Sequence, residues 1–345
     1  MTAADDSRVI DETLREAQLC DELGMDMVWL AEHHFDGICA YVDPVSFAAA
    51  LATATKRIII GFAVAQMSLH HPVRMAEQMA LIDNLSHGRL VVGLGRGTAY
   101  NIYDYNGYGL DPDEAQERLL EAEEIMLKAW TTENLEHHGK HWDLWLPLLR
   151  PACYTKPHPF TIRACSGEGS MLEMARAGRP FLMNVQTDET TKHRMDLYRK
   201  TMHDSGFDDA HVAAAVDDTW VWRNIFIADT DAEAERLGVP LFEEQREHRG
   251  RMRARILAER GETMVKAKQG ETGVASAPAR NVTGHSLICG SPATVAERLA
   301  AIDDIGVGGV ILQFRLGSSS YDLVENSIRL FMEQVAPQFK ARKAA

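Results

Sequence analysis

The chain has 345 residues, of which 46% are hydrophobic and 25% charged, a composition typical of globular proteins with one large α/β domain or two small ones. Its formal net charge of −14 argues against nucleic acid or an anionic membrane surface as a partner. No apolar run approaches the ~20 residues that a membrane span needs, and the first residues lack the apolar core of a signal peptide.

The cysteines are scattered, odd in number and without a Cys-x-x-Cys pair. This pattern predicts reduced thiols in the cytoplasm and neither a disulfide framework nor a zinc site, so no metal is expected. The sequence also lacks His-Glu-x-x-His, Gly-x-Ser-x-Gly and P-loop motifs, which disfavours a metalloprotease, a hydrolase or an NTPase.

Short apolar strands alternate with helices along the whole chain. Seven strands are predicted, at residues 25–31, 57–65, 90–94, 160–165, 180–185, 220–227 and 309–314. The predicted helices lie at residues 10–23, 45–55, 72–85, 112–130, 169–177, 188–205, 231–260, 291–304 and 321–335. This alternation is typical of parallel βα units.

The pattern favours an α/β fold of the (β/α)8 TIM-barrel type, because polar residues follow nearly every strand. A doubly wound sheet, which has one switch point, is the alternative. A barrel needs one more strand, which would precede the first helix: either the true start lies upstream of Met1, or the barrel has an open or partner-filled seam. We expect one domain over residues 1–345, with an irregular excursion at 131–159 that holds a hairpin near His138, and a lid insertion after the seventh barrel strand at 245–290.

The strand that begins near Val28 ends abruptly in the titratable run Glu32, His33 and His34. In an α/β barrel the carboxyl ends of the strands open into the active site. A polar strand end in contact with solvent is the simpler interpretation, but three titratable residues in a row favour a functional site.

Two glycine-containing strand ends are further candidates. Gly93–Gly97 is not a dinucleotide fingerprint, because the spacing of its glycines is wrong and no helix follows directly. Its glycines could let a flat ligand approach the backbone beside the charge of Arg96, or could form a tight turn with a solvated arginine. Ser166–Ser170 lies between a strand and a helix, and is either an anion site or a simple helix cap. Arg118 is a second phosphate contact or a surface charge.

Several motifs occur together in a characteristic order. They are Trp29–Phe35 (Trp-Leu-Ala-Glu-His-His-Phe), His71–Arg74 with Glu77, Gly88–Leu90 leading to Gly95-Arg96-Gly97, and Gly290-Ser291-Pro292. In this order and spacing the chain resembles the bacterial-luciferase-like flavin-dependent monooxygenases from about Ile10 to Phe339. The motifs are specific for the family and not for a substrate.

The resemblance implies a single (β/α)8 barrel that binds FMN, usually as a dimer, and takes reduced FMN from a separate flavin reductase to react with O2. By motif position it implies that His33 is the catalytic histidine. It also implies a non-proline cis peptide at Ala63–Val64 against the flavin. Gly95 stands where the luciferases have a cysteine near the flavin, so light emission is not expected. The expected cofactor contacts are Ala63, Val64, Gly95, Arg96, Arg118, Ser166, Gly167 and Ser170, of which Arg96, Arg118, Gly167 and Ser170 match the phosphate site.

The chemistry that the resemblance implies is oxygenation of a small, largely apolar molecule through a C4a-peroxyflavin, with His33 moving a proton. Two alternatives remain open at this point: an oxidoreductase that uses a deazaflavin, and a non-catalytic flavin-binding subunit.

Overall fold

The computed structural model describes residues 2–35, 37, 39–97, 102–270 and 283–339. The chain divides into two compact units, residues 1–163 and 164–345, and each is described by itself.

The first unit has a parallel sheet with strand order β1-β2-β4-β7, and β3 also pairs with β4. The register aligns Met27 with Ile59, Ile60 with Leu90, and Val91 with Phe160. Its strands are β1 (Met27–Leu30), β2 (Ile59–Phe62), β3 (Ala65–Gln66), β4 (Leu90–Gly95), β5 (Leu135–His138), β6 (Asp143–Leu146) and β7 (Phe160–Cys165), the last of which ends in the second unit. Its helices are α1 (Ala3–Leu23), α2 (Pro44–Ala54), η1 (Met67–Leu69), α3 (Pro72–Ser86), α4 (Ile102–Gly107), η2 (Pro112–Glu114) and α5 (Ala115–Thr131).

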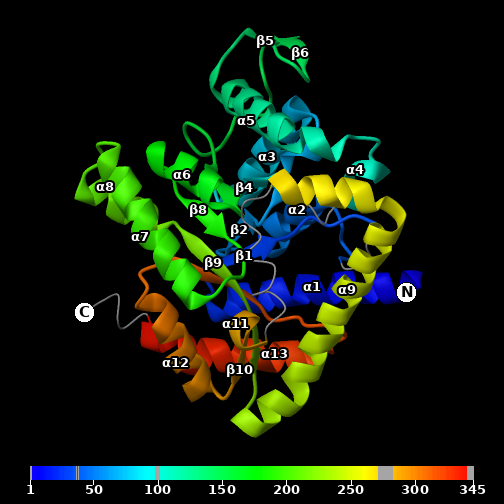
Figure 1. Cartoon of the computed structure of the whole chain (residues 1–345), viewed down its shortest axis with the longest axis vertical. Helices are drawn as coiled ribbons and strands as arrows, with labels where there is room; N and C mark the ends of the chain where they lie inside the picture. The colour runs from blue at the N-terminus through cyan, green and yellow to red at the C-terminus, as the bar shows by residue number, and fades with distance from the viewer. Residues whose placement is uncertain (1, 36, 38, 98–101, 271–282, 340–345) are drawn as a thin grey trace. The chain divides into compact units, whose positions relative to one another are not determined.

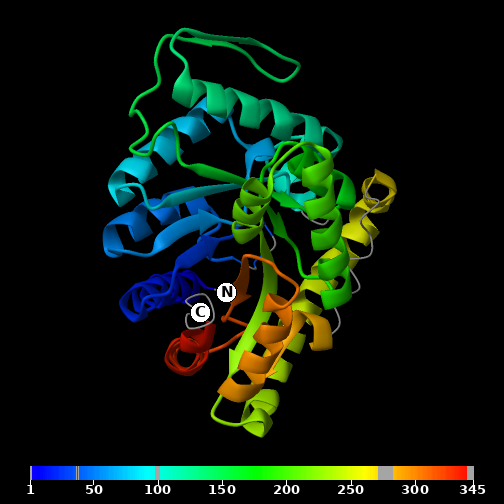
Figure 2. The ribbon, with the colours of Figure 1, turned by 90° about the vertical axis from the view of Figure 1, so that its left-hand side faces the viewer.

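Local sequence signals explain where these elements begin and end. Helix α1 ends at Gly24, whose φ of +80° favours glycine over any residue with a side chain. Asp21, in the last turn of α1, accepts hydrogen bonds from the backbone N–H groups of Lys56, Arg57 and Ile58, and so fixes the entry into β2. Helices α2, α3 and α5 then pack one against the next beside the strands (Figure 2).

The second unit contains the parallel strands β8, β9 and β10, with β11 also paired to β9 (Figure 1). Its strands are β8 (Phe181–Met183), β9 (Trp220–Ile227), β10 (Leu287–Gly290) and β11 (Gly309–Gln313). Its helices are α6 (Glu168–Arg176), α7 (Asp188–Asp204), α8 (Asp209–Asp217), α9 (Asp231–Gly270), α11 (Thr283–Ser286), α12 (Pro292–Asp303), α13 (Tyr321–Leu330) and η3 (Phe331–Val335).

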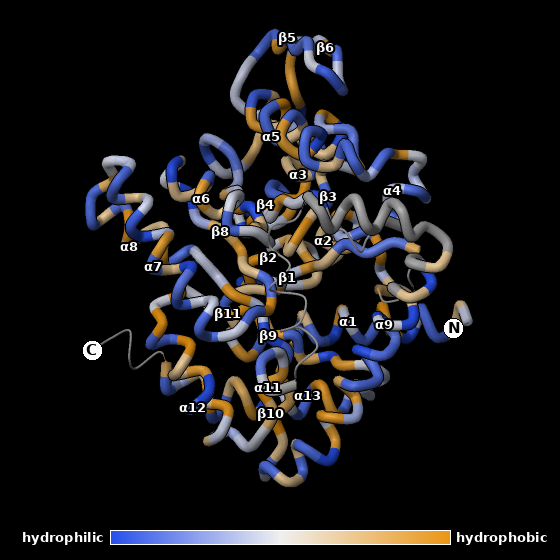
Figure 3. Tube along the Cα trace, viewed as in Figure 1, coloured by the Kyte–Doolittle hydropathy of each residue, from blue (hydrophilic) through white to orange (hydrophobic). Residues whose placement is uncertain are grey.

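Hydrophobic residues are concentrated along the strands of each unit, whereas α9 is largely hydrophilic (Figure 3). In the first unit, Ile60, Phe62, Val92 and Leu94 are fully buried in the core between the strands and the helices. In the part of the chain that the structure describes, no helix is long and apolar enough to cross a membrane.

All seven predicted strands are present, and so is the hairpin near His138, where β5 and β6 pair in antiparallel fashion. The predicted strand at 57–65 is divided into β2 and β3. One assignment needs correction: residues 287–290, which were placed inside the lid insertion, form β10 and pair with β9. Their apolar run is only four residues long and follows a long polar segment, so the sequence pattern did not indicate a strand. Residues 245–270 of the predicted lid belong to α9, and residues 271–282 lie outside the described residues.

Candidate functional site

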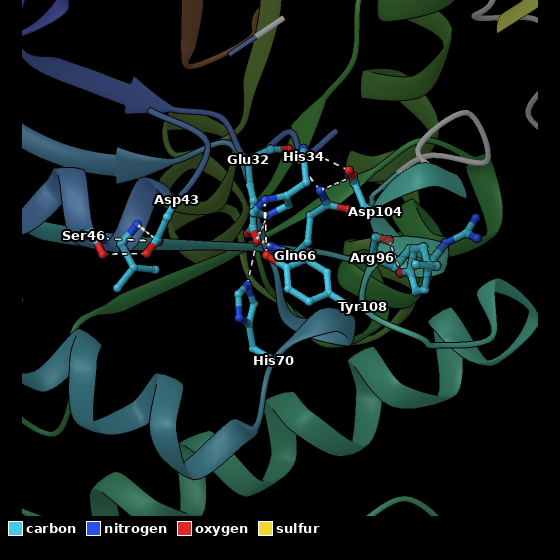
Figure 4. Close-up of polar contacts among 11 residues, drawn as sticks. Glu32, His34, Asp43, Ser46, Gln66, His70, Arg96, Asp104 and Tyr108 are labelled. Carbon is cyan, nitrogen blue, oxygen red and sulfur yellow. Dashed lines mark hydrogen bonds and ion pairs between the residues drawn. The ribbon is translucent and has the colours of Figure 1, made fainter. Parts of the chain in front are cut away.

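The carboxylate of Glu32 is the centre of a buried polar cluster at the end of β1 (Figure 4). Its side chain has no exposed surface. The Nε2 atom of His34 lies 2.9 Å and that of His70 lies 2.6 Å from the same Glu32 oxygen, Oε1. The backbone N–H of Gln66 donates to the other oxygen, Oε2, at 2.6 Å.

These partners keep Glu32 ionised. Burial alone would raise the pKa of its carboxyl group, but the hydrogen bonds from His34 and His70, the charge of His70 and the Gln66 N–H outweigh burial and lower the pKa to about 2. An ionised carboxylate can only accept hydrogen bonds, so both histidines carry a hydrogen on Nε2.

A second carboxylate fixes the backbone around this cluster. The backbone N–H of His34 donates to Oδ1 of Asp104 at 2.9 Å, and the side-chain amide of Gln66 donates to Oδ2 at 2.8 Å. The same amide also reaches the backbone oxygen of Glu32, at 3.0 Å. Gln66 and Asp104 are both buried, so their hydrogen bonds join the segment after β1 to β3 and α4.

The cluster extends from the buried Glu32 towards the surface on two sides. Burial alone would lower the pKa of His34, but the hydrogen bond and the charge of Glu32, helped by Asp104 and Asp43, raise it. The Nδ1 atom of His34 lies 3.3 Å from the hydroxyl oxygen of Tyr108, which is exposed, and the side chain of His70 is 27% exposed. A chain of contacts therefore runs from the exposed Tyr108 through the buried His34 and Glu32 to the partly exposed His70.

His33, the predicted catalytic histidine, is partly buried and lies in the chain between Glu32 and His34, which are both buried. Its two neighbours are thus held by the hydrogen bonds of the cluster, which fixes the backbone on both sides of His33.

Three of the predicted flavin contacts meet within the first unit. The Ala63–Val64 peptide bond is cis, which confirms that prediction. The register of β3 on β4 places Gln66 opposite Gly95, and a Cβ atom added to Gly95 would lie 2.6 Å from Cγ2 of Val64. Glycine at this position lets the Val64 side chain lie against the backbone of β4.

Two predicted phosphate contacts also come together in the first unit, around Tyr105. Its hydroxyl donates to the backbone oxygen of Arg96 at 2.5 Å. Burial raises the pKa of Tyr105 to about 12, against the effect of the nearby charges of Arg96 and Arg118, which lower it. Arg118 is held in place by a 2.9 Å hydrogen bond from Nε to the backbone oxygen of Ser68 and by the Trp142 ring, 4.8 Å from its guanidinium carbon.

The other predicted phosphate contacts lie together in the second unit, at the start of α6. Gly167 is the N-cap of this helix, and the hydroxyl of Ser170 donates to the Gly167 carbonyl at 3.0 Å. The carbonyl of Ser166 accepts a hydrogen bond from Arg194 at 3.1 Å. The residues predicted to contact the phosphate therefore fall into two groups, one within each unit.

The Glu-His-His run lies at the strand end where this cluster forms, but most of the cluster's other residues had no signal in the sequence. Glu32 and His70 are 38 positions apart, and His34 and Asp104 are 70 positions apart, so spacing cannot pair them. The sequence feature near His70 is Pro72, which starts α3 and gives no sign that His70 contacts Glu32. Among the described residues, no group of three or more His, Cys, Asp and Glu side chains could hold a metal ion.

The sequence of the chain is similar to those of known flavin-dependent enzymes. The family model described as luciferase-like monooxygenase matches residues 2–308. The oxygenase component of a flavin-dependent trigonelline monooxygenase from Acinetobacter baylyi is 29% identical over 152 residues, which is 44% of this chain and 42% of that protein. The chain spans about half the length of the curated relatives it matches.

Solved structures share the fold over almost the whole chain. Monooxygenase RslO1 from Streptomyces bottropensis is 25% identical with a TM-score of 0.78, covering 97% of this chain and 94% of that one. The oxygenating constituent of 3,6-diketocamphane monooxygenase from Pseudomonas putida, solved with FMN, has a TM-score of 0.74 at 22% identity, covering 98% and 94%. An F420-dependent secondary alcohol dehydrogenase has a TM-score of 0.71 at 14% identity, covering 95% and 94%. These likenesses confirm the α/β, TIM-barrel fold predicted from the sequence.

Proposed function

Because the chain belongs to the luciferase-like monooxygenase family, we propose that it is the oxygenase component of a two-component, FMN-dependent monooxygenase. It would take reduced FMN from a separate reductase and use O2 to oxygenate a small, largely apolar organic molecule. The separate reductase is supported by the name of the trigonelline relative, an oxygenase component. A homodimer, a cytoplasmic location and a single domain over residues 1–345 belong to the same proposal.

One observation carries the cofactor assignment: Arg96, whose backbone oxygen accepts a hydrogen bond from the buried Tyr105, and Arg118, whose Nε donates to the backbone oxygen of Ser68, bring two positive charges near Tyr105. Guanidinium groups suit a phosphate monoester, because their planar fork of N–H donors matches its oxygens. The donor set of the first unit therefore fits the phosphate of FMN. Ser166, Gly167 and Ser170 would add hydroxyl and backbone N–H donors at the start of α6.

The residues of the first unit have distinct roles in this proposal. Val64 and Gly95 would contact the flavin ring, together with Ala63. The imidazole of His33 would move a proton to or from the reacting oxygen or the substrate, since histidine is the side chain that ordinarily changes charge near neutral pH. Glu32 and His34 would hold the backbone on either side of His33. When bound, the reduced flavin would supply the electron pair that activates O2.

A deazaflavin oxidoreductase is the second candidate, because the F420-dependent dehydrogenase has the same fold. The two functions differ in their need for O2. A deazaflavin enzyme would transfer a hydride without O2, whereas the proposed monooxygenase would incorporate an oxygen atom from O2 into its product.

Anaerobic titration of the purified protein with reduced FMN and with reduced F420 tests the assignment, followed by exposure to 18O2 with a set of small aldehydes, ketones and alkenes. We expect the protein to bind reduced FMN, and one of the products to contain an 18O atom from O2. Binding of reduced F420 with no binding of reduced FMN would overturn the proposal in favour of the second candidate. Binding of FMN with no consumption of reduced FMN above background would indicate a non-catalytic subunit.

A further inference from the structure

Three arginine side chains are buried among the described residues, and they differ in what balances their charge. Arg163 donates through Nε to the carboxylate of Glu123 at 3.0 Å, and Arg223 donates through Nη2 to that of Asp188 at 2.9 Å. Arg194, 5% exposed, donates to the side-chain oxygen of Gln186 at 2.6 Å and to the backbone oxygen of Ser166 at 3.1 Å. Both acceptors of Arg194 are neutral.

A buried positive charge without a negative partner is unfavourable, because it has lost its hydration and gained no ion pair. Burial accordingly lowers the pKa of Arg194, and Glu168 and Cys165 offset this only in part. Glu168 is half exposed, with its carboxylate 3.7 Å from His193, so solvent screens its charge. Within the described part of the second unit, the charge of Arg194 lacks a buried counter-charge.

The position of Arg194 suggests what that counter-charge is. Helix α7, which carries Arg194, packs against α6 (Figure 1). Arg194 binds the carbonyl of Ser166, the residue before the N-cap Gly167 of α6. The backbone N–H groups of the first helical turn already favour an anion at this end of α6. The buried guanidinium of Arg194, bound to the Ser166 carbonyl, adds a positive charge to the same place.

We propose that Arg194 is a positioning residue for the cofactor phosphate: it holds the Ser166–Gly167 loop in place and supplies the buried positive charge that favours a phosphate monoester there. This inference rests on the proposed function, since the phosphate is that of FMN. Gln186 fixes the same guanidinium group, because its side-chain oxygen accepts a hydrogen bond from Nη1 of Arg194 while Nη2 donates to Ser166.

The experiment compares reduced FMN with reduced riboflavin, which has the same ring system and no phosphate. Both are titrated anaerobically into wild-type protein, Arg194→Met and Arg194→Lys. The matched control is Arg199→Met, which removes a charge from the same helix where the side chain binds the backbone oxygen of Gly306.

We expect Arg194→Met to weaken FMN binding about tenfold, because it removes the buried positive charge and the hydrogen bond to the Ser166 carbonyl, and to leave riboflavin binding unchanged. Arg194→Lys keeps the charge but cannot bridge Gln186 and Ser166, so its loss of FMN affinity should be smaller but measurable. Arg199→Met should bind both flavins as the wild type does.

Equal loss of FMN and riboflavin affinity in Arg194→Met, or no loss of either, would overturn the role of Arg194 while the proposed function stands. If Arg194→Met does not fold, Arg194→Lys decides, because a wild-type preference for FMN in that variant also overturns the role. A wild-type protein that binds FMN and riboflavin equally well would refute this inference and the phosphate contacts assigned to Arg96 and Arg118, but not the flavin-dependent oxygenation. A wild-type protein that binds neither flavin would refute the proposed function as well.

Discussion

His70 places its Nε2 atom 2.6 Å from Oε1 of Glu32, although 38 positions separate the two residues in the chain. His34 shares the same oxygen, so one buried carboxylate joins the end of β1 to the segment that leads into α3. The local structure around His33 therefore depends on Glu32 being ionised.

The substitution Glu32→Gln should lower the free energy of unfolding in a pH-dependent way. The folded-state pKa of Glu32, about 2, lies below its ordinary value of 4.5. The ionised group thus contributes stability above pH 4.5, and this contribution is lost as the pH falls towards 2. From the size of the shift, we expect wild type to exceed Glu32→Gln by roughly 3 kcal/mol at neutral pH.

Urea unfolding of both proteins between neutral pH and pH 3 measures this difference. The gap between them should narrow as the pH decreases through the range from 4.5 to about 2. A gap that stays constant with pH would show that the charge of Glu32 is not what stabilises the cluster.

Substitutions of the adjacent histidines should separate chemistry from stability. His33→Ala should bind FMN but lose substrate oxygenation, with a change in unfolding free energy of less than about 1 kcal/mol, because His33 is only partly buried. His34→Ala should cost about 1–3 kcal/mol, because it leaves the buried Glu32 carboxylate without one of its hydrogen bonds. Thermal unfolding and product analysis of the two variants check this. Unchanged turnover in His33→Ala would remove His33 from the mechanism.

Much of the fold could be predicted from the sequence because its strands are short apolar runs bounded by clear turn signals. Gly24, at φ +80°, and Pro72, at the first turn of α3, end and begin helices where expected. The strand β10 was not predicted because it has only four residues and follows a long polar segment. Its extended conformation depends on pairing with β9, which the sequence does not reveal.

The site was harder to predict, because its hydrogen bonds join residues that are far apart in the sequence. Titratable residues next to each other, such as Glu32 and His34, can be recognised from the sequence. The contribution of Asp104 cannot, since its carboxylate reaches the backbone of a residue 70 positions away. Arg194 was likewise not recognised, because nothing in a helical sequence distinguishes a buried arginine from a solvated one.

The contact between Gly95 and Val64 predicts a compensating pair of substitutions. A Cβ at position 95 would lie 2.6 Å from Cγ2 of Val64, so Gly95→Ala should cost about 1–3 kcal/mol through overpacking. Combining it with Val64→Ala removes the clashing methyl group, and the double variant should be more stable than the sum of the single effects implies. Urea unfolding of the four proteins measures the coupling. Additive effects within about 0.5 kcal/mol would show that the two side chains do not compete for the same space.

For the buried ion pair between Glu123 of α5 and Arg163 of β7, removing both partners should be less harmful than removing one. Arg163 donates to a single oxygen of Glu123 through both Nε and Nη2, and both side chains are almost fully buried. Glu123→Leu should therefore destabilise the protein by about 3–5 kcal/mol, because it leaves a guanidinium buried without its carboxylate. In the double variant Glu123→Leu with Arg163→Met, this ion pair is removed as a whole, and most of the lost stability should be recovered.

Arg96 and Arg118 are unchanged in the double variant, so its affinity for reduced FMN should be that of the wild type. Chemical unfolding compares the stabilities, and a double variant no more stable than Glu123→Leu would show that burial of an unpaired charge is not the cause of the loss.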